Sequence, residues 1–192
     1  MEDYKKGEAE DDFYVNMHEI LPNLWLGNLE ASLDSKTLTE KKISNVLSIL
    51  ARHSEEVQGA NHLRLTMRDG TPYRHEQLLA GIKFIKGALD RGEGVLVHCM
   101  AGVSRSSTMV AAYLMRELNY NPWKAITHLK GIRQIVDPAF ETFTSAVEWV
   151  FPNRILTCQK CGKFWEYIED YAFISREQLD NICRCSIPLL DV

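Results

Sequence analysis

Short apolar stretches separated by turn-forming residues recur through the first half of the chain. The stretch at 62–67 alternates apolar and polar side chains and runs into Arg-Asp-Gly, whereas the stretches at 44–50 and 95–99 are mainly apolar. Alternation with a period of two is typical of a half-buried strand, and a short apolar run is typical of a buried one. The pattern predicts strands in these three stretches and a short edge strand over residues 20–28.

Longer segments with apolar residues three or four positions apart alternate with these stretches. The clearest lies at 75–90, where Leu78, Ile82, Ile85 and Leu89 share one face. Further helices are predicted over residues 32–42 and 106–118, over a segment that starts at Asn121-Pro122, and from Asp137-Pro138 to Val150. Strands that alternate with helices predict an α/β fold, in which helices flank a central, mostly parallel sheet.

The two ends of the chain differ in composition from its centre. Residues 1–15 are polar and acid-rich, without the apolar core of a secretion signal, and predict a flexible solvated tail. The main domain is predicted over residues 16–152, followed by a small cysteine-containing appendage over residues 153–192. The longest apolar run, 109–115, is too short to cross a bilayer, which predicts a soluble protein.

The net charge limits the classes of partner, and the placement of the cysteines indicates the cellular compartment. A net charge of −4 and a pI near 5.9 argue against nucleic acid or an anionic membrane as the main partner. Of the five cysteines, Cys99 stands alone and the others lie near the C-terminus. An odd cysteine count without a secretion signal indicates a reducing compartment, the cytoplasm or the nucleus, and no disulfide framework. The sequence gives no indication of the oligomeric state.

The segment GVLVHCMAGVSRSSTMVAAYLM passes from a buried strand to an apolar helix through a loop with the spacing Cys-x5-Arg. Ligands of open α/β sheets bind at the carboxyl ends of strands, near helix N-termini. Gly102 permits a close backbone approach or a positive φ, and the Arg105 guanidinium can hold two phosphate oxygens at once. The loop therefore predicts a phosphate-binding nest formed by Met100, Ala101, Gly102, Val103, Ser104 and Arg105.

The same loop would activate the thiol of Cys99. A helix N-terminus and a neighbouring arginine lower a thiol pKa, so that the group is a thiolate near neutral pH. A thiolate directed at a bound phosphate is a nucleophile for phosphorus. The alternative is a buried structural cysteine with Arg105 on the surface. We favour the nucleophile because the spacing follows an apolar strand and opens a helix.

The stretch HCMAGVSRS followed by AYLM resembles the signature of cysteine-dependent protein tyrosine phosphatases, and specifically of dual-specificity protein phosphatases. The stretches ILPNLWLGN, ISNVLSIL and KAITHLKGIR add weaker similarity, and together the resemblance covers about residues 18–150. It implies a tyrosine-phosphatase-like fold and catalysis without a cofactor. The implied reaction is hydrolysis of phosphotyrosine and phosphoserine or phosphothreonine in phosphoproteins, through a phosphocysteine intermediate. The short segment before the first strand is similar to that of the small, atypical members.

The resemblance also assigns roles to individual side chains. Family members carry a general acid about thirty residues before the cysteine, which corresponds to Asp69 in MRDGTP. Asp90 is the rival carboxylate, but it ends a helix shortly before Cys99. The resemblance implies that the Ser106 hydroxyl donates to the cysteine sulfur, although a serine there could also be a helix N-cap. His98 points away from its neighbour on the strand and is expected to support the loop rather than act as a base.

Other functions remain open at this point. The loop positions Met100, Ala101, Val103 and Ser104 are uncharged, whereas family members that act on inositol phospholipids carry lysines there, so phosphoproteins are favoured over non-protein phosphate esters. A sulfur-transfer or arsenate-reducing enzyme would have a similar loop without the acid. A phosphopeptide-binding module with little turnover typically lacks the nucleophile or the acid.

The appendage contains four cysteines in the short motifs CQKCGKFW and CRC. A segment of this size needs a stabilising crosslink, and four thiolates around one Zn²⁺ would supply it. Free thiols packed against the main domain and a resolving thiol for Cys99 are the alternatives. The predicted ligands of this structural zinc are Cys158, Cys161, Cys183 and Cys185.

Overall fold

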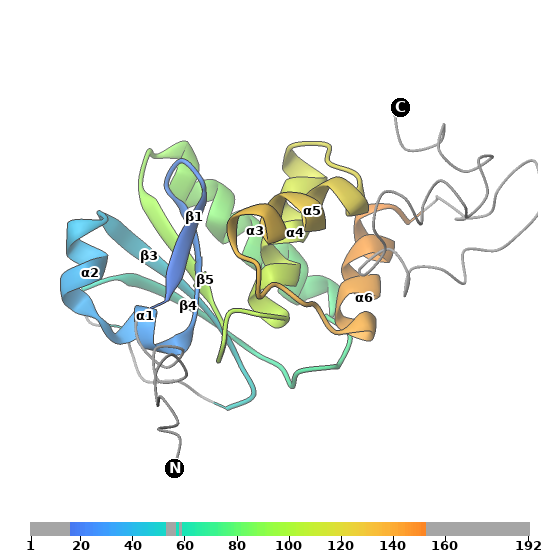
Figure 1. Ribbon diagram of the computed structural model, residues 1–192, viewed down its shortest axis with the longest axis horizontal. Helices are drawn as coiled ribbons and strands as arrows, with labels where there is room; N and C mark the ends of the chain where they lie inside the picture. Colours follow the sequence, from blue (N-terminus) through green and yellow to red (C-terminus); the bar gives the residue numbers. More distant parts are fainter. Residues whose placement is uncertain (1–15, 53–56, 58, 153–192) are drawn as a thin grey trace, which may run out of the picture.

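The computed structural model describes residues 16–52, 57 and 59–152. Its strands are β1 (Met17–Leu21), β2 (Leu24–Gly27), β3 (Ile43–Leu50), β4 (Asn61–Thr66) and β5 (Gly94–His98). They form one sheet in the order β1-β2-β5-β3-β4 (Figure 1). Strand β1 pairs antiparallel with β2, and every other neighbouring pair is parallel. The predicted mostly parallel sheet is therefore confirmed.

Helices cover both faces of the sheet. They are α1 (Leu29–Leu33), α2 (Ser35–Glu40), α3 (His75–Asp90), α4 (Arg105–Glu117), α5 (Pro122–Ile132) and α6 (Phe140–Val150). Helices α1 and α2 lie on one face, and α3 to α6 lie on the other (Figure 1). The alternation of strand side chains explains both layers, because Val95 and Val97 join the larger core under α3 to α6 while Leu96 joins the smaller core under α1 and α2.

Three predicted elements differ from the structure near their ends. The expected single strand over 20–28 is a β1–β2 hairpin, because Asn23 adopts a φ of 67° and turns the chain. The expected helix over 32–42 is two helices, because Asp34 ends α1 and caps α2 by accepting from two backbone N–H groups. The last helix starts at Phe140 and not at Asp137-Pro138, because the Ala139 backbone is extended, with φ −61° and ψ 140°, and its N–H donates to the Ser104 hydroxyl.

The predictions for residues 1–15 and 153–192 fall outside the described residues, and so do the four cysteines proposed as zinc ligands, Cys158, Cys161, Cys183 and Cys185. Among the described residues, no group of histidine, cysteine, aspartate and glutamate side chains has the arrangement of a metal site. Within the same residues, no helix has the length and apolar character needed to cross a membrane.

Candidate active site

The predicted nucleophile lies where β5 ends and α4 begins. Strand β5 is buried along its whole length between β2 and β3. Its carboxyl end therefore lies at the centre of the edge where the parallel strands end. Cys99 follows directly and is 2% exposed. The loop then turns into α4, whose side chains from Arg105 to Met115 are all buried. A buried strand and a buried helix fix both ends of this loop, which favours a preorganised site.

The carbonyl groups of the loop point outward and are each bonded from outside it. Met100 accepts from Leu29 N at 3.0 Å, Ala101 from Arg133 Nη2 at 2.9 Å, Gly102 from Arg133 Nε at 3.0 Å, and Val103 from Asp137 N at 3.0 Å. Since a peptide unit directs its N–H opposite to its C=O, these bonds leave the N–H groups to converge on the concave side of the loop. Such a nest of N–H groups binds anions.

Gly102 is required by the shape of the loop. Its φ is +68°, and a Cβ placed there would lie 2.5 Å from the Gly27 oxygen and 2.8 Å from Arg133 Nη2. The positive φ and the close approach both disfavour any other residue. The sequence-based expectation for this glycine therefore agrees with the geometry.

The environment of the Cys99 sulfur favours the thiolate. Burial by itself raises the pKa of the thiol, but hydrogen bonds from the Ser106 hydroxyl and the Ser106 and Gly102 N–H groups, together with the Arg105 charge, leave the pKa below its ordinary value. The Ser106 hydroxyl donates to the sulfur at 3.2 Å. The N-cap of α4 is Ser104, so Ser106 lies inside the first turn and not at the cap.

Arg105 is buried, and not all of its N–H donors have an acceptor among the described residues. Its Nη1 donates to the Met67 carbonyl at 3.4 Å, and among the described residues its buried Nε finds no hydrogen-bond acceptor. The Asp69 carboxylate lies 3.7 Å from Nε, near enough for charge attraction but too far for a hydrogen bond. A buried guanidinium N–H without an acceptor is costly, and a phosphate oxygen in the nest would satisfy it.

Asp69 lies on the loop after β4 and faces the nest from above. Its side chain is 53% exposed, and its Oδ1 accepts from the Ser104 hydroxyl at 2.7 Å. The rival Asp90 ends α3 and pairs with Lys86 at 2.9 Å. It precedes the start of β5, whereas Cys99 follows its end, so the length of the strand separates the two groups. The structure brings Asp69 to the site and does not bring Asp90.

His98 is completely buried and supports the loop from below. Its Nδ1 lies 3.2 Å from the Cys99 carbonyl oxygen, and its Nε2 lies 2.5 Å from the Ser48 hydroxyl. Burial lowers the pKa of the imidazole to about 4, which keeps the ring neutral. This is the supporting position that the strand pattern predicted.

Two residues of the site have no distinguishing sequence pattern. The buried Tyr73 hydroxyl donates to the Arg105 carbonyl at 2.7 Å. Arg133 is 1% exposed and holds the loop carbonyls while its Nη1 bonds the side chains of Asn16 and His18. Arg133 belongs to KAITHLKGIR, one of the stretches that carries the family resemblance, but nothing in its local pattern indicates that the side chain is buried.

Similarity to known proteins agrees with this geometry. The family model described as dual specificity phosphatase, catalytic domain, matches residues 24–150. The human protein named dual specificity protein phosphatase 22 is 34% identical over 125 residues, which covers 64% of this chain and 67% of that protein. Its Xenopus tropicalis counterpart is 34% identical over 124 residues, which covers 64% of this chain and 59% of that protein.

Solved structures show the same fold. The crystal structure of DUSP15 has 26% identity and a TM-score of 0.65, and the match covers 86% of this chain and 95% of that one. The structure of PTPMT1 in complex with PI(5)P has 26% identity and a TM-score of 0.64, covering 71% and 95%. A human tyrosine phosphatase-like serine/threonine/tyrosine-interacting protein has 27% identity and a TM-score of 0.65, covering 69% and 94%. The chain therefore belongs to the dual-specificity phosphatase family, as a cysteine-dependent protein phosphatase of the small atypical type.

Proposed function

We propose that the protein hydrolyses phosphotyrosine and phosphoserine or phosphothreonine monoesters of phosphoproteins through a phosphocysteine intermediate. The observation that supports this best is the pairing of a thiolate-stabilising environment at Cys99 with an unsatisfied guanidinium donor of Arg105. The Cys99 sulfur receives hydrogen bonds that favour its anion, and the adjacent Arg105 Nε is buried with no acceptor among the residues that the structure describes. A tetrahedral dianion fits between them.

The reaction takes place in two displacements. The phosphate binds the N–H groups of the nest and the Arg105 guanidinium, and the Cys99 thiolate attacks phosphorus as the bond to the leaving oxygen breaks. Asp69 gives its proton to that oxygen, and the alcohol or phenol departs. Asp69 then takes a proton from a water that attacks phosphorus, which releases inorganic phosphate. The Ser106 hydroxyl stabilises the departing Cys99 thiolate by its hydrogen bond.

Hydrolysis of para-nitrophenyl phosphate tests this directly. The intact chain should turn over the ester, and Cys99→Ser should abolish turnover while leaving phosphate binding measurable. Rapid denaturation during turnover should trap one phosphoryl group on Cys99, detected by peptide mass spectrometry. Thr39→Ala is the control, because this hydroxyl bonds the Ser35 carbonyl within α2 and not the loop. Turnover in Cys99→Ser would refute the covalent route.

Dual specificity is a separate part of the proposal. It predicts measurable kcat/KM for matched phosphopeptides that differ only in carrying phosphotyrosine, phosphothreonine or phosphoserine. Activity toward phosphotyrosine alone would restrict the function to tyrosine phosphatase without changing the chemistry. Complete absence of turnover with tight phosphopeptide binding would instead identify a binding module. This binding measurement is included because one similar solved protein is described as a tyrosine phosphatase-like serine/threonine/tyrosine-interacting protein.

A phosphatase of non-protein phosphate esters is the second candidate. The similar solved structure of PTPMT1 holds PI(5)P, a phosphoinositide. In this chain the loop side chains of Met100, Ala101, Val103 and Ser104 carry no positive charge for additional phosphates, which favours phosphoproteins. Phosphoinositides in mixed micelles, compared with phosphopeptides at equal concentration, separate the two candidates by kcat/KM.

We also propose a structural zinc ion on Cys158, Cys161, Cys183 and Cys185, from their spacing alone. A reducing compartment, the cytoplasm or the nucleus, suits both these thiols and the catalytic one. Metal analysis after zinc-replete expression should find about one equivalent of zinc, and replacement of all four cysteines by serine should remove it. Less than about half an equivalent in the intact chain would contradict the proposal.

A further inference from the structure

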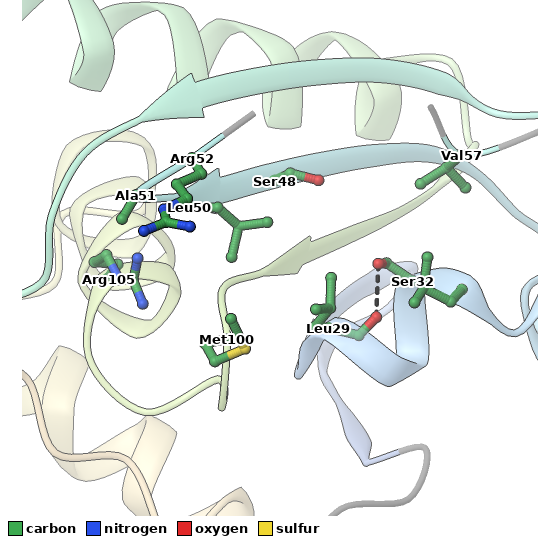
Figure 2. Close-up of a pocket in the computed structure, with 10 residues that line it drawn as sticks. Leu29, Ser32, Ser48, Leu50, Ala51, Arg52, Val57, Met100 and Arg105 are labelled. Atoms are coloured by element: carbon green, nitrogen blue, oxygen red, sulfur yellow. Dashed lines mark hydrogen bonds between the residues drawn. The ribbon is translucent and has the colours of Figure 1, made fainter. Parts of the chain in front are cut away.

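A cavity of about 660 Å³ lies directly beside the phosphate nest (Figure 2). The first helix supplies Leu29 and Leu33 to its wall, β3 supplies Leu50, and the catalytic loop supplies Met100 and Arg105. Arg105 therefore belongs both to the phosphate site and to the cavity. Anything whose phosphate occupies the nest would place its neighbouring atoms beside this opening.

The wall of the cavity is suited to an apolar group. Leu33 is 60% exposed and Met100 is 54% exposed, which are the highest values among the large apolar side chains of the described residues. No carboxylate of the described residues lines the cavity, and Arg52 adds a second positive charge to it. Burial of exposed leucine and methionine against an apolar ligand is favourable, whereas the two guanidinium groups would repel a cationic ligand.

We propose that this cavity binds a large apolar side chain, leucine, methionine or phenylalanine, close in sequence to the phosphorylated residue of a phosphoprotein. The proposal rests on the proposed function and specifies its substrate. A cavity of this volume is in the range that holds small organic ligands and has room for one such side chain. Because each residue of an extended peptide advances the chain by about 3.4 Å, the side chain comes from within about three positions of the phosphorylated residue.

A phosphopeptide series tests the proposal. Peptides with alanine at positions −3 to +3 are compared with peptides that carry leucine or phenylalanine at one of these positions. At least one placement should raise kcat/KM about tenfold, the effect of burying part of such a side chain. Leu33→Glu should remove that gain and leave para-nitrophenyl phosphate turnover unchanged. Leu79→Glu is the matched control, because Leu79 is an exposed leucine of α3 that does not line the cavity.

The outcomes separate the cavity from the chemistry. Equal kcat/KM across the peptide series, or the same gain in Leu33→Glu as in the intact chain, would refute the cavity proposal while para-nitrophenyl phosphate turnover upholds the function. If Leu33→Glu reduces turnover of phosphoinositides in mixed micelles and leaves peptide turnover unaltered, the cavity holds acyl chains and the peptide proposal is wrong. Absence of turnover with every substrate would refute the proposed function itself.

A second, independent observation concerns the face of the sheet beneath the nest. Ser48 of β3, His62 of β4 and His98 of β5 project on the same face, because Ser48 is opposite His98 and His62 is opposite Val46 in the strand register. The Ser48 hydroxyl lies 2.6 Å from His62 Nε2 and 2.5 Å from His98 Nε2. One hydroxyl therefore joins two imidazole rings.

The direction of each hydrogen bond follows from the outermost partners. The Cys99 carbonyl can only accept, so His98 Nδ1 carries the proton of the neutral ring and His98 Nε2 accepts from Ser48. The Val57 N–H donates to His62 Nδ1 at 3.2 Å, so the proton of a neutral His62 is on Nε2 and is donated to Ser48. All donors in this chain of bonds point toward the catalytic loop.

We infer that Ser48 and His62 are positioning residues that hold the His98 ring in place and thereby fix the Cys99 carbonyl. This bond orients the peptide unit at the start of the nest and helps to keep the sulfur in place. Without the Ser48 hydroxyl, the buried His98 Nε2 loses its donor, and among the described residues the ring keeps only its bond to the Cys99 carbonyl.

Nitrogen NMR and thiol alkylation test the inference. The ¹⁵N shifts of the intact chain should show His98 as the Nδ1–H tautomer with Nε2 accepting a hydrogen bond, and Ser48→Ala should move the Nε2 shift toward that of a ring nitrogen without a donor. The midpoint pH of Cys99 alkylation by iodoacetate should rise in Ser48→Ala and return in Ser48→Thr, which restores a hydroxyl. Thr142→Ala removes an equally buried hydroxyl, which bonds the Thr71 carbonyl, and should change neither readout. An Nε2–H tautomer of His98 in the intact chain, or the same alkylation midpoint in Ser48→Ala and the intact chain, would overturn it.

Discussion

The buried His98 makes the protein less stable in mild acid, and the size of this effect follows from two pKa values. The side chain is 0% exposed, and burial lowers the pKa of the imidazole from an ordinary value of 6.5 to about 4. In the unfolded chain the ring is free to protonate at its ordinary pKa. Between these two values the unfolded state binds more protons than the folded state, so the free energy of unfolding rises with pH.

The magnitude follows from the two pKa values. Protonation of His98 in the unfolded state lowers the free energy of unfolding by about 2 kcal/mol at pH 5 and by about 3 kcal/mol at pH 4, relative to pH 7. The loss is small above the unfolded pKa and is complete below the folded one. Because a domain of this size is typically stable by only about 5–15 kcal/mol, a loss of this size is easily measured.

Urea unfolding of the intact chain and of His98→Asn, at pH 7 and pH 5, measures this contribution. The asparagine amide can still donate to the Cys99 carbonyl but does not titrate. The stability advantage of the intact chain over the variant should therefore be about 2 kcal/mol smaller at pH 5 than at pH 7. Subtraction removes the titration of the other histidines, which the two proteins share. An advantage that is the same at both pH values would refute the assignment of a neutral, buried His98.

Three further predictions concern the reaction. Asp69→Asn should remove the basic limb of the pH–rate profile and lower kcat about hundredfold for esters with poor leaving groups, with little effect on para-nitrophenyl phosphate; an unchanged profile would show that another group is the acid. Arg105→Lys should lower kcat/KM about hundredfold or more, because an ammonium cannot bind two oxygens in the plane of the guanidinium; near-normal kinetics would contradict this. Ser104→Ala should lower kcat about tenfold with KM unchanged, because Asp69 loses its 2.7 Å hydrogen bond; a change in KM alone would contradict the positioning role.

The sheet and the nest could be predicted because their determinants are local. The apolar run before Cys99 and the apolar helix after it are visible in the chain, and the family signature lies between them. The helix that begins at Asn121-Pro122 is confirmed, since Asn121 accepts from Lys124 N at 2.7 Å. Local chemistry of this kind depends on neighbours within a few residues, which a sequence displays directly.

The errors arose where hydrogen bonds that the apolar pattern does not display set the end of an element. Asp137-Pro138 is a favourable helix start, yet Ala139 is extended and its N–H donates to the Ser104 hydroxyl, so the helix begins at Phe140. Asp34 lies within a helical pattern in the sequence, but its side chain caps a second helix. The apolar pattern indicates the buried face of a helix, whereas side-chain caps and tertiary contacts decide where the helix starts.

The parts of the site that no pattern reveals are the ones that orient the signature from outside. Arg133 lies more than twenty-five residues after the loop and donates to two of its carbonyls. Ser104 in the loop donates to Asp69, which precedes it in the sequence with α3 between them. In the proposed mechanism the signature therefore supplies the nucleophile and the anion donors, while contacts between remote segments set the direction of the donors and the distance of the acid. Since proton transfer and in-line attack both depend on precise placement, the rate is expected to depend on these remote contacts as well as on the signature.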